Sequence, residues 1–255
     1  MNLPFTLTCE PPFLIVAFAA AQDTLGWSLT APGFVEARTI AWLEVRNADL
    51  TPEVDPITHI REKFTAKGLG DGLGFLTSRD IRRHHLSQST VGDATATVVA
   101  TVGLSNGEHV GRPAGRGHGV GTINVLAHVS RPLSVAAFVE AISIVAEART
   151  AAVLATSALR AGPPITGTGT DCIVVAAPKG ERPEPYAGLH TGLGQALGAA
   201  VFEAIRDGAV QWSADMEPSA SRSVDLQVDG YEPGVVDLEV DAPGSRTGRS
   251  AADFL

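Results

Sequence analysis

The feature that most constrains this fold is a long, almost wholly apolar helix pattern with a strand pattern on each side. Ser134 is a capping residue, and helical spacing of apolar residues continues from it to about Leu154. Runs of β-branched and apolar residues at 121–129 and 171–177 predict the two strands. A strand–helix–strand crossover makes its two strands parallel within one sheet. The helix has so little polar surface that we expect it to pack on two sides.

Local capping residues and apolar periodicity predict the other elements. The Asp-Pro pair at 55–56 indicates a helix start, and the Lys-Gly pair at 67–68 indicates its end. Ser78 is expected to cap a short helix that reaches Arg82. Strands are also expected at 13–21 and 95–102, and a last helix at 192–207.

These patterns predict an α/β protein with a mixed β-sheet and packed helices. One main domain is expected over residues 1–210, followed by a polar C-terminal extension over 211–255. The extension contains a repeat, in which Val224–Asp229 recurs as Val236–Asp241. Alternation would place the apolar residues of each copy on one face and the carboxylates on the other. The extension is therefore interpreted as either a hairpin or a tail that stays unfolded.

Charge and composition exclude several classes of function. The formal net charge is −9, so nucleic acid is not an expected partner. The richest basic patch, at 79–85, is interpreted as a solvated helix end. No apolar run approaches the roughly 20 residues that span a bilayer, so we expect a cytoplasmic chain without a membrane partner. Cys9 and Cys172 have no metal-ligand spacing, and no metal site is expected.

Polar residues cluster at predicted strand ends, where ligands collect in α/β sheets. Ser105 and Asn106 follow the strand at 95–102, and Asn106 offers both a hydrogen-bond donor and an acceptor. A plain Asn-Gly turn is the alternative interpretation. Asn124, beside Thr122, lies within an apolar strand pattern. It therefore either pins a neighbouring loop or faces a pocket.

The loop at 166–171 contains Thr168, Gly169 and Thr170 and leads directly into a predicted strand. Its glycines let backbone N–H groups approach a ligand, and its hydroxyls add donors. It lacks the ending of a Walker loop. Asp171 could orient a histidine, hold a metal, act as a base or simply cap the turn.

Two further titratable residues are candidates for chemistry. Glu147 lies on the apolar helix and needs a partner, either in a structural ion pair or in a site. His190 precedes a helix that Thr191 is expected to cap, and the helix dipole there favours neutral imidazole. Neutral imidazole can accept a proton, although a structural histidine is the alternative.

Six motifs appear in an order that resembles the adenosylcobinamide amidohydrolase family of corrinoid salvage. They are Gly-Leu-Ser-Asn-Gly at 103–107, Gly-Thr-Ile-Asn at 121–124, Pro-Leu-Ser at 132–134, Glu-Ala-Arg-Thr-Ala-Ala at 147–152, Thr-Gly-Thr-Gly-Thr-Asp at 166–171 and Tyr-Ala-Gly-Leu-His-Thr at 186–191. The resemblance is clear over 95–205 and fainter around 74–80. This chain departs from the family at Gly107, where members tend to have alanine, and at Arg149, where they tend to have lysine.

The resemblance implies hydrolysis of the amide that joins a corrin propionate side chain to aminopropanol. The expected products are adenosylcobyric acid and the amino alcohol or its phosphate. The expected partner is therefore a corrinoid small molecule. No cofactor is expected, because the substrate itself carries cobalt.

From the motif chemistry we predict a mechanism based on His190 as the general base, oriented by Asp171. Asn106 or Asn124, with backbone amides of the glycine loops, would stabilise the oxyanion. Glu147 is either the acid for the leaving amine or a structural partner. A covalent route through Ser105 or Thr168 stays an alternative. The predicted substrate-binding residues are Ser105, Thr122, Thr168, Gly169, Thr170 and Thr191.

Two other classes of function compete with this prediction. The same loops could wrap a corrinoid without cutting it, which would make the chain a carrier. Alternatively, the loop at 166–171 could bind the phosphate groups of a transferase substrate. Cleavage of a corrinoid would distinguish the predicted hydrolase from a carrier. Stabilisation of the protein by a nucleotide would instead favour the transferase.

Overall fold

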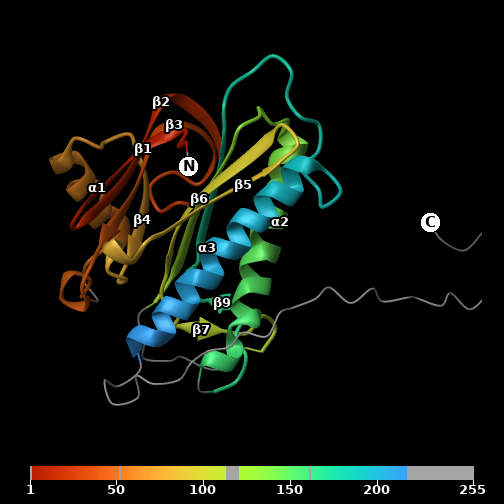
Figure 1. Cartoon of the computed structure of the whole chain (residues 1–255). Coiled ribbons are helices and arrows are strands. Elements are labelled where there is room, and N and C mark those ends of the chain that lie inside the picture. Colours follow the sequence, from red (N-terminus) through yellow and green to blue (C-terminus); the bar gives the residue numbers. More distant parts are fainter. Residues whose placement is uncertain (1, 52, 113–120, 161, 217–255) are drawn as a thin grey trace, which may run out of the picture. The chain divides into compact units, whose positions relative to one another are not determined.

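One mixed sheet of eight strands folds back on itself, so that its two halves face each other (Figure 1). The computed structural model describes residues 2–51, 53–112, 121–160 and 162–216. Within them the strand order is β4-β3-β2-β10-β8-β6-β5, and β1 pairs with β2 beside this path. The strands are β1 (Phe5–Glu10), β2 (Phe13–Gly26), β3 (Gly33–Glu44), β4 (Leu73–Thr77), β5 (His85–Val91), β6 (Ala94–Val102), β8 (Ile123–Val129) and β10 (Cys172–Ala177).

Helices cover the outer faces, and short elements complete the fold. The α-helices are α1 (Pro56–Lys67), α2 (Val135–Ala155) and α3 (Gly192–Met216). A two-stranded ribbon joins β7 (Gly107–Glu108) to β9 (Gly167–Thr168). Three 3₁₀ helices span Asn47–Asp49, Ile81–Arg83 and Ser157–Leu159. Among the described residues, no helix combines the length and apolar composition needed to cross a membrane.

The length of β2 explains why the sheet can fold back. β3 pairs with both ends of β2, whereas residues 13–18 of β2 pair also with β1 and its last four residues pair also with β10. The β2–β3 register shifts between Ala17 and Gln22, and irregularities of this kind bend strands. One strand therefore belongs to both halves of the sheet, and the bend lets the halves pack face to face.

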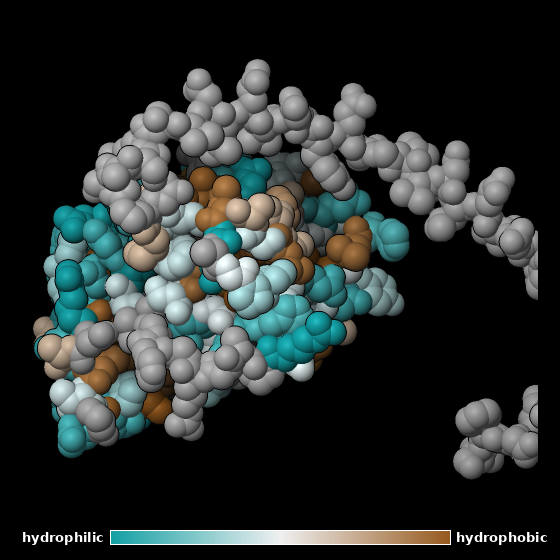
Figure 2. Space-filling model, turned by 90° about the horizontal axis from the view of Figure 1, so that it is seen from below, coloured by the Kyte–Doolittle hydropathy of each residue, from teal (hydrophilic) through white to brown (hydrophobic). Residues whose placement is uncertain are grey.

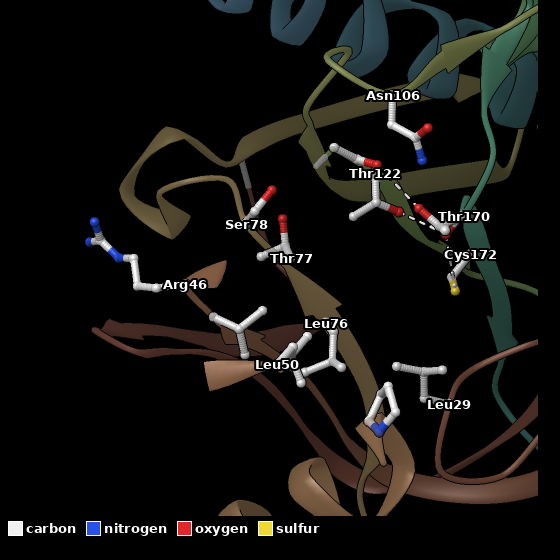
Figure 3. Close-up of a pocket in the computed structure, with 13 residues that line it drawn as sticks. Leu29, Arg46, Leu50, Leu76, Thr77, Ser78, Asn106, Thr122, Thr170 and Cys172 are labelled. Atoms are coloured by element: carbon white, nitrogen blue, oxygen red, sulfur yellow. Dashed lines mark hydrogen bonds between the residues drawn. The ribbon is translucent and has the colours of Figure 1, made fainter. Parts of the chain in front are cut away.

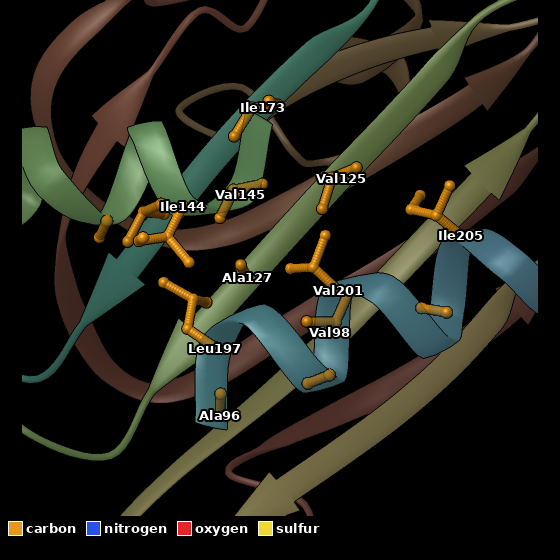
Figure 4. Close-up of a cluster of buried hydrophobic side chains, with 14 of the residues drawn as sticks. Ala96, Val98, Val125, Ala127, Ile144, Val145, Ile173, Leu197, Val201 and Ile205 are labelled. Carbon is orange, nitrogen blue, oxygen red and sulfur yellow. The ribbon is translucent and has the colours of Figure 1, made fainter. Parts of the chain in front are cut away.

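Successive side chains of each strand point to opposite faces of the sheet, so each half of the sheet packs on both of its faces. The molecule therefore has four layers. In β8, Val125 and Ala127 face α2 and α3, whereas Leu126 points into the interior between the two halves (Figure 4). In β3, Trp42 faces the same interior, and Leu43 packs against α1. The order of layers is thus α2 and α3, the β5-β6-β8-β10 half, the β1-to-β4 half, and α1.

The predicted crossover is confirmed. β8 and β10 are parallel neighbours, and α2 connects them along the chain. The Ser134 hydroxyl accepts a hydrogen bond from the Ala137 N–H at 3.1 Å, which caps α2. As expected, α2 packs on two sides, against α3 and against β10. Val135 and Val139 nevertheless stay more than half exposed on its outer face.

Three further capping predictions are confirmed, and one is wrong. Asp55 accepts from the Thr58 N–H at 2.8 Å, and Gly68 ends α1 with a left-handed φ of 78°. The Thr191 hydroxyl accepts from Gly194 at the start of α3. Ser78, however, caps nothing, because Asp80 accepts from Arg82 and begins the 3₁₀ helix.

Several boundaries differ from the prediction. β2 continues through Gly26, and α3 continues to Met216, so the predicted domain end at 210 falls inside a helix. The patch at 79–85 is only in part a solvated helix end. Arg82 and Arg83 are exposed at the end of the 3₁₀ helix, but His85 begins β5 and the Arg79 side chain is only 9% exposed. The repeat at 224–241 lies outside the described residues.

Candidate active site

A cavity of about 400 Å³ opens at one end of the inner layer, where strand ends from both halves meet. β3 and β4 end there, β6 ends there, and β8 and β10 begin there. Figure 2 views this end of the molecule and shows hydrophobic and hydrophilic residues interleaved across it. The lining residues are Leu29, Val45, Arg46, Leu50, Pro56, Leu76, Thr77, Ser78, Asn106, Gly121, Thr122, Thr170 and Cys172.

The cavity has a polar side and an apolar side. Asn106, Thr122 and Thr170 lie on one side of it, and leucines from the β1-to-β4 half lie opposite them (Figure 3). Apolar walls with a few placed polar groups are typical of small-molecule sites, because the walls exclude water and the polar groups orient the ligand. Three predicted site residues therefore meet in one cavity, although 16 to 64 positions separate them in the sequence.

Asn106 carries an unpartnered polar group in this cavity. Its backbone carbonyl accepts from the Gly169 N–H at 3.2 Å, which fixes the turn after β6. Its side-chain Nδ2 lies over Gly169, where an added Cβ would approach it to 3.4 Å. Among the described residues, no group hydrogen-bonds to the side-chain carboxamide. Both its donors and its acceptor are therefore available to a ligand.

The two threonines of the polar side are held by the backbone. The Thr122 hydroxyl donates to the Thr170 carbonyl at 2.7 Å, and the Thr170 hydroxyl donates to the Gly121 carbonyl at 3.1 Å. Each hydroxyl has used its single proton, so each can only accept a hydrogen bond from a ligand. These contacts also join the start of β8 to the start of β10.

Asp171 organises the loops behind the cavity and does not enter it. Its carboxylate pairs with Arg149 of α2 and accepts from the Thr168 hydroxyl and N–H and from the Ile123 N–H. Its carbonyl accepts from the Trp27 indole at 2.6 Å. The Asp171 side chain is 8% exposed, and burial lowers the pKa of Arg149. A buried carboxylate with this many donors is a structural anchor.

The predicted pairing of Asp171 with His190 is wrong. Asp171 bonds to Ile123, which pairs with Val102 at the end of β6. His190 directly precedes α3, and Gly192 there contacts Val91 next to the start of β6. β6 has nine residues, so about 30 Å separates the two ends. Figure 1 shows α3 starting at the end of the sheet opposite β7 and β9.

His190 is exposed and has no hydrogen bond within the described part of the chain. The neighbouring hollow that Thr191 lines is a different one, formed with the β5–β6 turn. Its role as a general base stays a prediction that no partner in the structure supports.

Asn124 and Glu147 are also away from the cavity. Asn124 is fully buried and donates to the Leu76 carbonyl at 2.7 Å, so it pins β4 against β8 across the two halves. Glu147 is exposed on α2, where Ser143 donates to it at 3.4 Å. Of the two interpretations of Asn124, this contact favours the structural one, although the partner lies in a strand and not in a loop.

The remaining predicted residues surround the cavity without lining it. Thr168 is bonded to Asp171, and Gly169 lies under Asn106. Ser105 is exposed and lines an adjoining hollow. Among the described residues, no three histidine, cysteine, aspartate or glutamate side chains gather as they would to hold a metal ion.

Ser78 and Cys172 are lining residues whose place the sequence motifs did not predict. No described residue bonds to the Ser78 hydroxyl, which points into the cavity (Figure 3). Burial raises the pKa of the Cys172 thiol to about 11, so it is a neutral thiol near pH 7 and a poor nucleophile. The faint resemblance at 74–80 was the available signal for Ser78.

Fold and cavity together define a four-layer α/β protein with a small-molecule cleft at one end of its facing sheet halves. A family model described as adenosylcobinamide amidohydrolase matches residues 4–217. The chain belongs to the adenosylcobinamide amidohydrolase family, and the resemblance seen in its motifs is confirmed.

One curated relative and one solved structure describe its similarity further. The chain is 35% identical over 148 residues to the adenosylcobinamide amidohydrolase of Halobacterium salinarum (strain ATCC 700922 / JCM 11081 / NRC-1). That alignment covers 53% of this chain and 62% of the relative. The crystal structure of the PH0078 protein from Pyrococcus horikoshii OT3 aligns with a TM-score of 0.38 and 14% identity, over 81% of this chain and 79% of that one.

Proposed function

We propose that this protein hydrolyses the amide between the corrin propionate side chain and aminopropanol of adenosylcobinamide. The products would be adenosylcobyric acid and the amino alcohol. The observation that carries the proposal is the family match over residues 4–217, which includes all residues that line the cavity. The cavity adds the chemical support, because it holds an unpartnered carboxamide opposite an apolar wall.

The size of the cavity limits which part of a corrinoid it can take. A volume of about 400 Å³ suits a side chain and a ring edge rather than a whole macrocycle. In our proposal the amide arm enters beside Asn106, and the apolar edge of the ring lies against Leu29, Leu50 and Leu76. Burial of apolar surface against these leucines would supply binding energy.

Asn106 is the group we assign to the reaction. Water adds to the amide carbon, the carbonyl oxygen becomes an oxyanion, and the C–N bond breaks as the amine leaves with a proton. The Asn106 side-chain N–H would donate to that oxyanion, and the Ser78 hydroxyl would be a second donor. Among the described lining residues there is no imidazole or carboxylate, so we assign no general base.

The phosphate-binding alternative finds no support in the loop at 166–171. Its Thr168 N–H and hydroxyl, which would have to bind a phosphate, already donate to the Asp171 carboxylate. A second anion at the same donors would be repelled by that carboxylate. A non-catalytic carrier remains the competing class, and turnover separates it from the proposal.

The test is incubation of the purified protein with adenosylcobinamide, followed by mass spectrometry. We expect adenosylcobyric acid and aminopropanol in equal amounts, formed in proportion to enzyme. Tight corrinoid binding without these products would establish a carrier instead. A His190→Ala variant should retain kcat/KM within about threefold, since His190 lies at the opposite end of the sheet from the cavity.

A further inference from the structure

A second cavity adjoins the one that holds Asn106, and its chemistry differs. It has a volume of about 530 Å³, and Val45, Arg46 and Ser78 line both cavities. The first cavity has a wall of leucines, whereas the second combines charged and hydroxyl side chains with apolar ones. The lining residues are Val45, Arg46, Ala48, Ser78, Arg79, Asp80, Gly103, Ser105, Trp212 and Met216.

Arg79 is the unusual group of the second cavity. Its side chain is only 9% exposed, and its Nη2 donates to Asp215 at 2.5 Å. Its Nε is buried without a hydrogen-bond partner, and no described residue bonds to Nη1. A guanidinium has five N–H donors in a planar fork that fits carboxylates and phosphates. Arg79 therefore keeps donors unused in a place where unused donors are costly.

The acidic groups nearby are already bonded to arginines, and one of them, Asp215, is bonded to Arg79 itself. Asp80 accepts from both Nε and Nη2 of Arg82, and Asp215 also pairs with Arg83 at 3.6 Å. Glu44 pairs with Arg46 at 3.0 Å. The charged residues that line the second cavity are thus two arginines and one aspartate. In a chain of net charge −9, this local excess of arginine with unused donors is suited to an anion.

We propose that the second cavity binds the amino-alcohol side of the substrate, and that Arg79 selects substrates in which this side carries a phosphate. The inference rests on the proposed function, because the amide must lie between the two cavities. With the ring edge against the leucines and the amide beside Asn106 and Ser78, the tail points into the second cavity. A phosphate there accepts from Arg79, with Arg46 and the Ser105 hydroxyl as further donors.

The test compares two substrates that differ only in the phosphate, adenosylcobinamide and adenosylcobinamide phosphate. For the wild type we expect the higher kcat/KM with the phosphate. In Arg79→Gln the ratio of the two kcat/KM values should fall about 10- to 100-fold, the worth of a hydrogen bond to a charged group. Arg79→Lys should restore part of the ratio, because it keeps the charge and loses the fork.

Arg83→Gln is the matched control, because Arg83 pairs with the same Asp215 but does not line the cavity. It should leave the ratio within about twofold of wild type. If Arg79→Gln lowers kcat/KM equally for both substrates, so that the ratio of the two values is unchanged, the proposal is overturned.

A binding measurement separates this proposal from the failure of the proposed function. Isothermal titration compares 1-amino-2-propanol with its phosphate ester on wild type and Arg79→Gln, and needs no turnover. The anion site is supported if the wild type binds the phosphate ester and Arg79→Gln weakens this binding about tenfold or more, even if no corrinoid is cleaved. Equal binding of both fragments by the wild type overturns it.

Discussion

Asn106 and Asn124 carry the same side chain in different surroundings. The Asn106 carboxamide faces the cavity without a partner, whereas the Asn124 carboxamide is buried and bonded to the Leu76 carbonyl. Loss of Asn106 should therefore affect the reaction, and loss of Asn124 should affect the fold. The difference gives a paired test at the scale of single residues.

We expect Asn106→Ala to lower kcat about 100- to 1,000-fold, the usual loss when one oxyanion donor is removed. Its free energy of unfolding should stay near that of the wild type. Asn124→Ala should lower the free energy of unfolding by about 1–3 kcal/mol, because the partly buried Leu76 carbonyl loses the donor that Asn124 supplies. Steady-state kinetics and urea denaturation measure the two effects. Full activity of Asn106→Ala would remove Asn106 from the mechanism.

The Asp171–Arg149 pair is the second test at this scale. In Asp171→Asn the charge on Arg149 remains while its partner is lost, so we expect a loss of about 3–5 kcal/mol in unfolding free energy. Arg149→Met combined with Asp171→Asn should cost less than the sum of the single changes, because no unpaired charge then remains. Chemical denaturation of the four proteins of this cycle measures the coupling. If the unfolding free energies lost in the two single variants simply add in the double variant, Asp171 and Arg149 are not energetically coupled.

At the scale of elements, α3 contains glycines with opposite surroundings. A Cβ added at Gly198 would meet only Ile144 Cγ2, at an ordinary 3.6 Å. A Cβ added at Gly208 would lie 2.5 Å from Val102 Cγ2, because α3 packs closely on the end of β6. The two positions belong to one helix, so helix propensity is the same for both.

Gly198→Ala should raise the free energy of unfolding by about 0.5–1 kcal/mol, through helix propensity and a less free unfolded chain. Gly208→Ala should gain the same stabilisation from helix propensity, but it forces β-branched Val102 to move, which costs about 1–3 kcal/mol. We therefore expect it to be neutral or destabilising. Thermal denaturation of both variants checks the sign. Equal stabilisation by both would mean that the α3–β6 contact is looser than the structure shows.

At the scale of the whole molecule, the pKa of His128 depends on the packing of the two halves of the sheet. It lies on β8 in the interior, and its ring contacts the rings of Phe5 and Phe18. Burial lowers the pKa of His128 from 6.5 to about 4. The folded protein therefore holds this imidazole neutral at pH values at which an unfolded chain would protonate it.

This shift predicts a loss of stability in acid. Above pH 6.5 neither state binds the proton, and the packing of neutral His128 contributes fully. As the pH falls from 6.5 towards 4, only the unfolded state gains the proton, so up to about 3 kcal/mol is lost. Unfolding free energies measured across this range should fall less steeply in His128→Leu. His190→Gln, at an exposed histidine, is the control and should keep the wild-type slope.

Local interactions explain which elements could be predicted from the sequence. The caps at Asp55, Ser134 and Thr191, and the crossover through α2, depend on neighbours within a few residues or on one apolar period. β1, β3, β4 and β5 were not predicted, because polar residues or glycine interrupt the apolar residues in their sequences. Asn106, Thr122 and Thr170 were expected in a site because they lie at strand ends, and all three line the same cavity.

The sequence by itself determined the capped helices, the parallel strand pair and the family to which the chain belongs. Only the tertiary structure decided which polar groups meet. The bend of β2 brings Leu76 of β4 and the following Ser78 to the cavity that Asn106 lines, and His190 lies at the other end of the sheet from Asp171. Caps and periodic patterns act over a few residues. The way in which the two halves of the sheet face each other depends on contacts between residues far apart in the chain, and no local sequence pattern predicts these contacts.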